Sequence, residues 1–114
     1  MINIIKDKRG ILSAIEFFKI PFKPKRVFLL HGLKASRGGH YHKKCKQYLF
    51  IVSGKCTILL EDKKTNEKTT LTATAGEQVY LSCYTKIVIK NPSKDCIICV
   101  LCNKKYDPTD VYYD

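Results

Sequence analysis

The 114-residue sequence contains no hydrophobic run long enough to span a membrane, and residues 1–9 lack the basic start and unbroken apolar stretch of a signal peptide. We therefore expect a cytoplasmic protein with no membrane partner. A chain of this length fits one domain, predicted to span residues 1–114, and can bury a hydrophobic core without disulfide bonds. The six cysteines are predicted to be reduced thiols, because cytosolic redox buffers keep thiols reduced.

Acidic residues are also scarce: the sequence has 10 of them and 21 lysines and arginines, which gives a formal net charge of +11. Such a charge attracts nucleic acid, anionic membrane surfaces or phosphorylated small molecules, and it does not choose among them. The lysines form no run of five or more, and no helix-turn-helix, zinc-finger or RNP-like pattern accompanies them. We therefore expect no nucleic-acid partner, although a basic nucleic-acid-binding barrel stays open as a weaker alternative.

The sequence lacks the apolar spacing of amphipathic helices, whereas from Arg26 onward short β-branched and aromatic runs alternate with turn signals. This pattern is typical of an all-β sandwich or barrel. The N-terminal third is less regular, and the prolines at 21 and 24 indicate an edge or a linker there, whose free backbone groups could pair with a neighbouring subunit. Strands are predicted over residues 25–31, 39–42, 47–53, 55–61, 68–74, 78–81, 86–90 and 95–102.

Two histidines stand out in the segment Arg37-Gly-Gly-His40-Tyr-His42-Lys43. Because side chains alternate across a strand, His40 and His42 are expected to project from one face while Tyr41 points the other way. Arg37 and the two glycines add a fixed positive charge and a backbone that a ligand can approach closely, which suits an anionic ligand. The alternative is that the two histidines are exposed polar residues without a functional role.

The histidine spacing fits the cupin pattern, in which His-x-His is followed by an acidic metal ligand and then by a glycine. Gln47 occupies the acidic position and Gly54 the glycine position, while Ile87 stands where a second motif has its histidine. A neutral amide and an aliphatic side chain leave two histidines as the only metal ligands, which makes a weak site. We therefore predict no metal and no cofactor, and imidazoles free for acid–base chemistry.

The stretch Arg37-Gly-Gly-His40-Tyr-His42-Lys43 resembles the Arg-Gly-x-His-x-His-Lys signature of the dTDP-4-keto-6-deoxyglucose 3,4-ketoisomerases, which are WxcM-like or FdtA-type cupins. The resemblance spans nearly the whole chain. It implies a homodimeric cupin jelly-roll barrel that moves the ketone of a dTDP-linked keto sugar from C4 to C3 without a metal. Further matching stretches are Asp7-Lys-Arg9-Gly10, Ile20-Pro-Phe22, Lys25-Arg-Val-Phe28, Val52-Ser-Gly54, Asp95-Cys96 and Tyr106-Asp107 through Asp110.

The resemblance also implies residue roles. His40 is the expected base that removes the C3 proton, and His42 orients the substrate or relays a proton to the enediol oxygen. Guanidinium groups match phosphate oxygens, so Arg9, Arg26 and Arg37 are the candidates for the diphosphate. The predicted substrate-binding residues are Arg9, Arg26, Arg37, Lys43 and Gln47.

Two departures from the family pattern keep a second hypothesis open. The family commonly has tyrosines after the Arg-Val pair, whereas this sequence has Phe28 and Leu29, and the family's Trp-His pair aligns with Lys86 and Ile87. The loss of these groups would fit a non-catalytic cupin that binds a nucleotide sugar or another anionic ligand.

The spacing Cys96-x-x-Cys99-x-x-Cys102 is reminiscent of a zinc or iron–sulfur site. Strand alternation would place Cys99 on the face opposite the other two, so the three thiols could not converge on a metal. We therefore expect these cysteines to act as small core hydrophobes.

Overall fold

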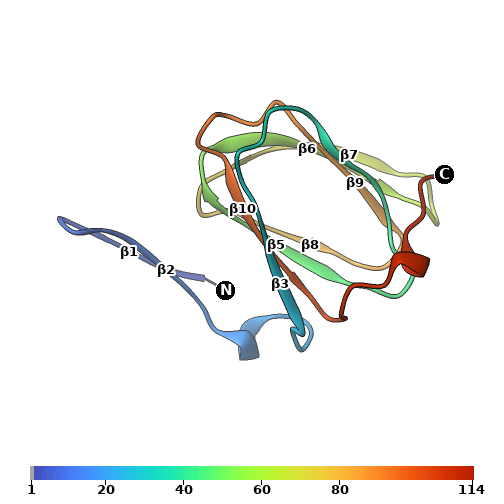
Figure 1. Ribbon diagram of the computed structural model, residues 1–114, viewed down its shortest axis with the longest axis horizontal. Coiled ribbons are helices and arrows are strands. Elements are labelled where there is room, and N and C mark those ends of the chain that lie inside the picture. The colour runs from blue at the N-terminus through green and yellow to red at the C-terminus, as the bar shows by residue number, and fades with distance from the viewer. Residues whose placement is uncertain (1) are drawn as a thin grey trace.

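A computed structural model describes residues 2–114 as antiparallel strands joined by turns, with two short 3-10 helices (Figure 1). The elements are β1 (Ile2–Asp7), β2 (Gly10–Ile15), η1 (Phe17–Lys19), β3 (Arg26–Leu30), β4 (Arg37–His40), β5 (Gln47–Ser53), β6 (Lys55–Asp62), β7 (Lys68–Thr74), β8 (Gln78–Leu81), β9 (Thr85–Lys90), β10 (Ile97–Cys102) and η2 (Pro108–Asp110). Within residues 2–114, no helix has the length and apolar character needed to cross a membrane.

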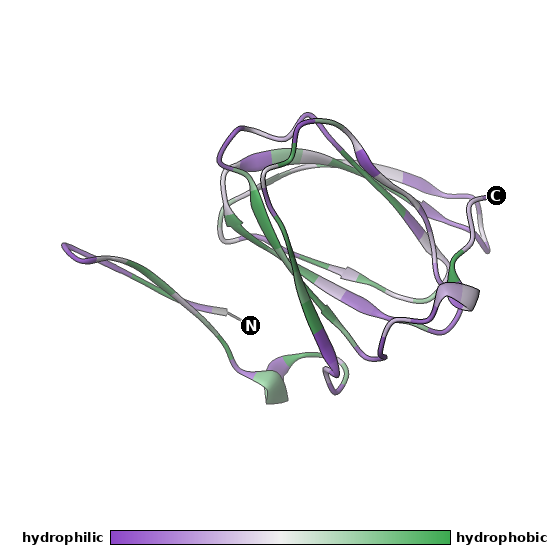
Figure 2. Cartoon of the chain, in the orientation of Figure 1, coloured by the Kyte–Doolittle hydropathy of each residue, from purple (hydrophilic) through white to green (hydrophobic). Residues whose placement is uncertain are grey.

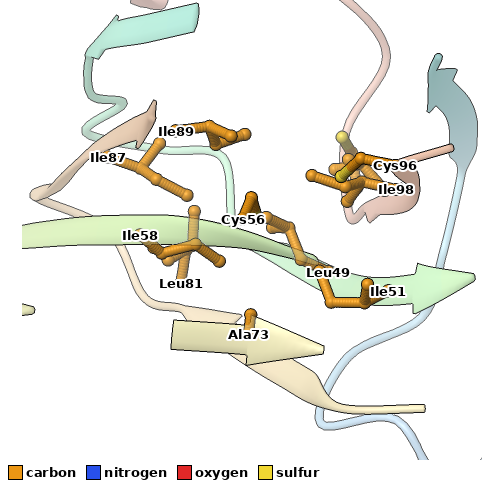
Figure 3. Close-up of a cluster of buried hydrophobic side chains, with 12 residues drawn as sticks. Leu49, Ile51, Cys56, Ile58, Ala73, Leu81, Ile87, Ile89, Cys96 and Ile98 are labelled. Atoms are coloured by element: carbon orange, nitrogen blue, oxygen red, sulfur yellow. The ribbon is translucent and has the colours of Figure 1, made fainter. Parts of the chain in front are cut away.

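Two four-stranded sheets build the barrel, one in the order β3-β10-β5-β8 and the other in the order β4-β9-β6-β7. Every pair of neighbouring strands is antiparallel. The sheets enclose an apolar core, and the labelled side chains of Figure 3 converge on it from both. Ile51, Ile58 and Ile98 are fully buried, and each such side chain contributes about 1.5–3 kcal/mol to folding. The predicted all-β jelly-roll barrel of the cupin type is therefore the observed fold.

The predicted alternation of Cys96, Cys99 and Cys102 is confirmed, whereas the prediction that they are core residues is wrong for Cys99. Cys96 and Cys102 belong to the core, with 1% and 0% of their surface exposed, whereas Cys99 lies outside the core cluster and is half-buried. All six cysteines are free thiols.

The predicted strands agree closely with the observed ones, and the bounds of β5, β7 and β8 are those predicted. The prediction for residues 39–42 was wrong in its bounds, because β4 begins at Arg37 and ends at His40. Pairing with β9 stops opposite Ile87, and Tyr41 instead forms a β-bridge with Tyr112 near the C-terminus.

The N-terminal segment is more regular than the sequence suggests. Strands β1 and β2 pair with each other in a hairpin that projects from the barrel (Figure 1). Apolar side chains of the hairpin and of the following turn are exposed, among them Ile11, Leu12 and Phe18, the last at 81%. Val27 and Leu29, on the outer face of β3, are more than half exposed as well, and Figure 2 shows the apolar character of β3.

Candidate active site

A cavity of about 460 Å³ opens between the two sheets at one end of the barrel. Its apolar floor comes from β5, β9 and β10, through Leu49, Ile87, Ile89 and Val100. Its polar wall carries both histidines together with two arginines and a glutamine: His40, His42, Arg26, Arg37 and Gln47. The cavity therefore combines an apolar surface with a few convergent polar groups, as small-molecule sites do.

The two imidazoles lie against each other in this wall. Their ring centroids are 5.4 Å apart and the rings meet edge to face. His40 ends β4 and His42 follows the bridged residue Tyr41, so both histidines face the cavity while Tyr41 is buried on the other side. The sequence prediction that the two imidazoles converge is confirmed.

A β-bulge in β4 brings Arg37 to the same side as His40. In the pairing with β9, Gly38 lies opposite Val88 and His40 lies opposite Ile87, so Gly39 is the extra residue. One inserted residue reverses the alternation of side chains along the strand. Arg37 and His40, three positions apart, consequently both face the cavity.

The pKa of His40 lies below its ordinary value. Burial of the ring is the largest cause, and the nearby charges of His42 and Arg37 lower it further, against a hydrogen bond to the Gly38 backbone that raises it. His40 is therefore neutral at pH 7, which is the form that accepts a proton.

The other imidazole has a fixed tautomer. His42 Nδ1 lies 2.6 Å from the backbone carbonyl oxygen of Asp110. A carbonyl oxygen only accepts hydrogen bonds, so Nδ1 must carry a proton. In the neutral ring, Nε2 is then left as the proton acceptor.

Two arginines supply positive charge to the cavity from different strands. The guanidinium of Arg26 on β3 is held between aromatic rings, 4.7 Å from the centroid of Phe28 and 5.2 Å from that of Tyr106. Arg37 on β4 is exposed and has no ion pair among residues 2–114. Gln47 donates from Nε2 to the sulfur of Cys102 at 3.6 Å, which orients its amide at the cavity wall.

Two predicted substrate-binding residues lie elsewhere in the single chain. Lys43 is absent from the lining of the cavity, and its Nζ sits 4.1 Å from the ring centroid of Tyr112. Arg9 lies at the tip of the β1–β2 hairpin, where its side chain is 89% exposed and pairs with Asp7 at 2.6 Å. Within one chain, neither cation lines the cavity.

The two departures from the family pattern differ in their position. The side chains of β3 alternate, so that Phe28 points inward and Leu29, 56% exposed, points out of the barrel. Ile87 is 7% exposed and lies opposite His40 across the β4–β9 pairing, in the cavity floor. Phe28 and Ile87 both line the cavity from the barrel interior, so each departure places one apolar side chain in the site.

Sequence analysis missed the contribution of the C-terminal segment. Tyr106, Val111 and Tyr113 line the cavity, and the ring of Tyr113 lies 6.1 Å from that of His40. The sequence carried one signal, the family match from Tyr106 to Asp110, but none of these residues was predicted to belong to the site. Within residues 2–114, no three His, Cys, Asp or Glu side chains form a cluster able to bind a metal ion.

The whole chain, residues 1–114, matches the family model FdtA, described as WxcM-like, C-terminal. The chain is similar to a curated TDP-4-oxo-6-deoxy-alpha-D-glucose-3,4-oxoisomerase from Aneurinibacillus thermoaerophilus, with 38% identity over 109 residues that cover 93% of this chain and 78% of that protein.

Solved structures give the same picture. QdtA, a sugar 3,4-ketoisomerase from Thermoanaerobacterium thermosaccharolyticum solved in complex with TDP, superposes with a TM-score of 0.88 at 28% identity, covering 99% of this chain and 84% of that one. WlaRA, a TDP-fucose-3,4-ketoisomerase from Campylobacter jejuni, gives 0.84 at 28% identity, with 98% and 84% covered. The epimerase RmlC from Legionella pneumophila gives 0.81 at 13% identity over 96% of this chain and 68% of that one, which is a likeness of fold alone.

Proposed function

The chain belongs to the WxcM-like, C-terminal family, and we propose that it is a 3,4-ketoisomerase that acts on a TDP-linked 4-keto-6-deoxyhexose. The observation that carries this proposal is the pair of imidazoles in the cavity wall, one neutral and one with a fixed tautomer, beside Arg37, which has no ion pair among residues 2–114. The family match and the named 3,4-ketoisomerases favour catalysis over a cupin that only binds its ligand.

The reaction moves a ketone between adjacent carbons and is balanced by proton transfers alone. Neutral His40 removes the proton from C3, which the neighbouring C4 ketone acidifies, and an enediolate forms. His42 Nε2 accepts the O3 proton and returns a proton to O4, while the cationic wall stabilises the developing oxyanion. Protonated His40 then releases a proton to C4, directly or through water, which leaves the ketone at C3 and returns His40 to its neutral form. No oxidant, reductant or metal enters these steps.

The cationic side of the cavity would hold the diphosphate. Arg26 is preoriented by two aromatic rings, and Arg37 is brought beside His40 by the bulge at Gly39. Guanidinium groups bind phosphate oxygens in a bidentate manner, so two arginines on adjacent walls anchor the nucleotide while the sugar reaches the histidines. Gln47 lines the same cavity and is proposed to bind the sugar.

The direct test is incubation of the protein with TDP-4-keto-6-deoxyglucose in deuterium oxide. NMR is expected to detect exchange of the C3 proton and the accumulation of a 3-keto sugar. If neither exchange nor a new keto sugar appeared, while TDP still bound, the protein would be a binding module and the proposal would be wrong.

We further propose that the protein is a homodimer in which the β1–β2 hairpin crosses to the partner subunit. The support is the exposed apolar surface of the hairpin, through Ile11 and Leu12, and that of the outer face of β3, through Val27 and Leu29. Exposed apolar surface of this extent commonly marks a protein interface. Crossing would also move Arg9 away from its own barrel and toward the partner's site. The cytoplasmic location and the single domain over residues 1–114 stay predictions.

Complementation between two variants tests this arrangement. R9A is expected to lose affinity for the TDP sugar and H40N to lose proton abstraction, so each variant alone is nearly inactive at low substrate concentration. If Arg9 acts in the partner's site, a mixed dimer has one site with both residues intact, and mixing the variants restores activity. Equal activity before and after mixing, with subunit exchange verified by mass spectrometry, would show that Arg9 does not act across the dimer.

A further inference from the structure

The C-terminal segment binds the barrel on both sides of His42. We name residues 106–114 the C-terminal strap; it lies at one end of the barrel, red in Figure 1. Before His42, the backbones of Tyr41 and Tyr112 exchange two hydrogen bonds of 2.9 and 3.0 Å. After His42, the strap binds the amides of residues 43–45 through Asp110. The histidine therefore sits between two attachments of the same segment.

Asp110 is the one charged residue that is buried within residues 2–114, with 4% of its surface exposed. Its Oδ1 accepts from the amide of Lys43 at 2.9 Å and its Oδ2 from that of Cys45 at 3.1 Å, and both oxygens lie 3.2 Å from the amide of Lys44. No lysine or arginine pairs with this carboxylate in the described part of the chain. Three successive amides form an anion-binding concavity, and such hydrogen bonds are what allow a charge to be buried.

The same residue supplies the oxygen that holds His42. The Asp110 carbonyl accepts from His42 Nδ1 at 2.6 Å, so the carboxylate and the carbonyl of one residue bind the stretch of chain that carries the imidazole. Because the Asp110 carboxylate binds the amides of residues 43–45, the Asp110 carbonyl has a fixed position relative to the His42 ring. This position selects the Nδ1–H tautomer and directs Nε2 toward the cavity.

We infer that Asp110 is a positioning residue, whose buried carboxylate fixes the backbone carbonyl that keeps His42 in the Nδ1–H form required for proton relay. The inference rests on the proposed function only in giving His42 a role in proton relay. The tautomer itself is a property of the protein without substrate. A ring that turned or changed tautomer would present a proton donor where O3 needs an acceptor. Misplacement of a catalytic group by about 1 Å costs about 10²-fold in rate.

The first experiment needs no variant. Nitrogen-15 NMR of histidine-labelled protein, with its three histidines assigned through H31N and H40N, is expected to show neutral His42 as the Nδ1–H tautomer. A neutral His42 protonated at Nε2 would overturn the inference. This measurement is independent of catalysis, so the absence of isomerase activity would refute the proposed function and leave the tautomer result standing.

The second experiment compares D110N with D107N. The amide of D110N has one acceptor oxygen and places an NH₂ group against backbone N–H donors, so the strap loosens. D107N makes the same chemical change three residues earlier, where the side chain of the exposed Asp107 accepts from the Thr109 amide at 2.9 Å and forms no hydrogen bond with His42 in the described part of the chain. We expect D110N to mix the His42 tautomers and to lower kcat about 10²-fold with little change in KM, and D107N to change neither.

The outcomes separate positioning from general stability. A folded D110N protein that keeps both the Nδ1–H tautomer and the wild-type kcat would overturn the inference. If D110N fails to fold, D110E serves as the second variant: it keeps the charge, and partial recovery of the tautomer together with kcat is expected. Loss of kcat in D110E with an unchanged tautomer would contradict the inference as well.

Discussion

Replacing His40 with asparagine is expected to abolish exchange of the C3 proton while binding of TDP persists. Asparagine keeps a polar side chain of similar size at the end of β4, but its amide does not take up a proton near neutral pH. General bases of this kind contribute about 10²–10⁴-fold to rate, so kcat should fall by that factor. The measurement is C3 exchange by NMR in deuterium oxide, alongside calorimetric titration with TDP.

H31N is the matched control for this experiment, because His31 is exposed and does not line the cavity. The wild type adds a second readout. The pKa of His40 is lowered, so the base is lost only as the pH falls through a value below 6.5, and kcat/KM should stay level down to that point. Wild-type exchange rates in H40N, or a similar loss in H31N, would remove His40 from the role of base.

Replacing Gly38 with alanine is expected to damage both stability and activity. Gly38 has φ +102°, and a Cβ atom built on it would lie 2.5 Å from the carbonyl oxygen of Ile87 on the neighbouring strand β9. The strands would have to separate at the bulge that aims Arg37 and His40 into one cavity. We expect a loss of about 2–4 kcal/mol in the free energy of unfolding and about 10²-fold in kcat.

G39A isolates the steric part of this effect. Gly39 has φ +84°, which also disfavours alanine, but a Cβ atom there would meet nothing within 4 Å. Denaturant unfolding and kinetics of the two variants should therefore show backbone strain alone in G39A and strain plus collision in G38A. Equal losses in both variants would mean that the contact with Ile87 is unimportant.

Much of the barrel is predictable from the sequence because its strands are short β-branched and aromatic runs between turn signals. In β7 the covered Leu71 and Ala73 alternate with exposed residues, whereas β5 is a continuous apolar run whose residues 48–51 are all buried. The hairpin of β1 and β2 is not predictable in this way. Its apolar side chains are exposed in the single chain, so no pattern of buried and exposed faces marks it as part of the barrel.

The site is predictable only as far as local spacing reaches. His40 and His42 are two residues apart, and strand alternation is enough to place them together. The bulge at Gly39 depends on the pairing with β9, and the Asp110 carbonyl that binds His42 lies 68 residues further along the chain. Such contacts depend on tertiary structure. The imidazoles are therefore predictable from the sequence, whereas the groups that orient them are not.

The position of β10 has a consequence for biosynthesis. It is the last strand in the chain, yet it lies between β3 and β5 in its sheet. While the ribosome is still making residues 97–102, β3 and β5 have no partner between them, and the backbone groups of these strand edges stay open to solvent. The nascent chain therefore cannot close its barrel gradually, and the interval before β10 emerges is when it most needs protection by a chaperone.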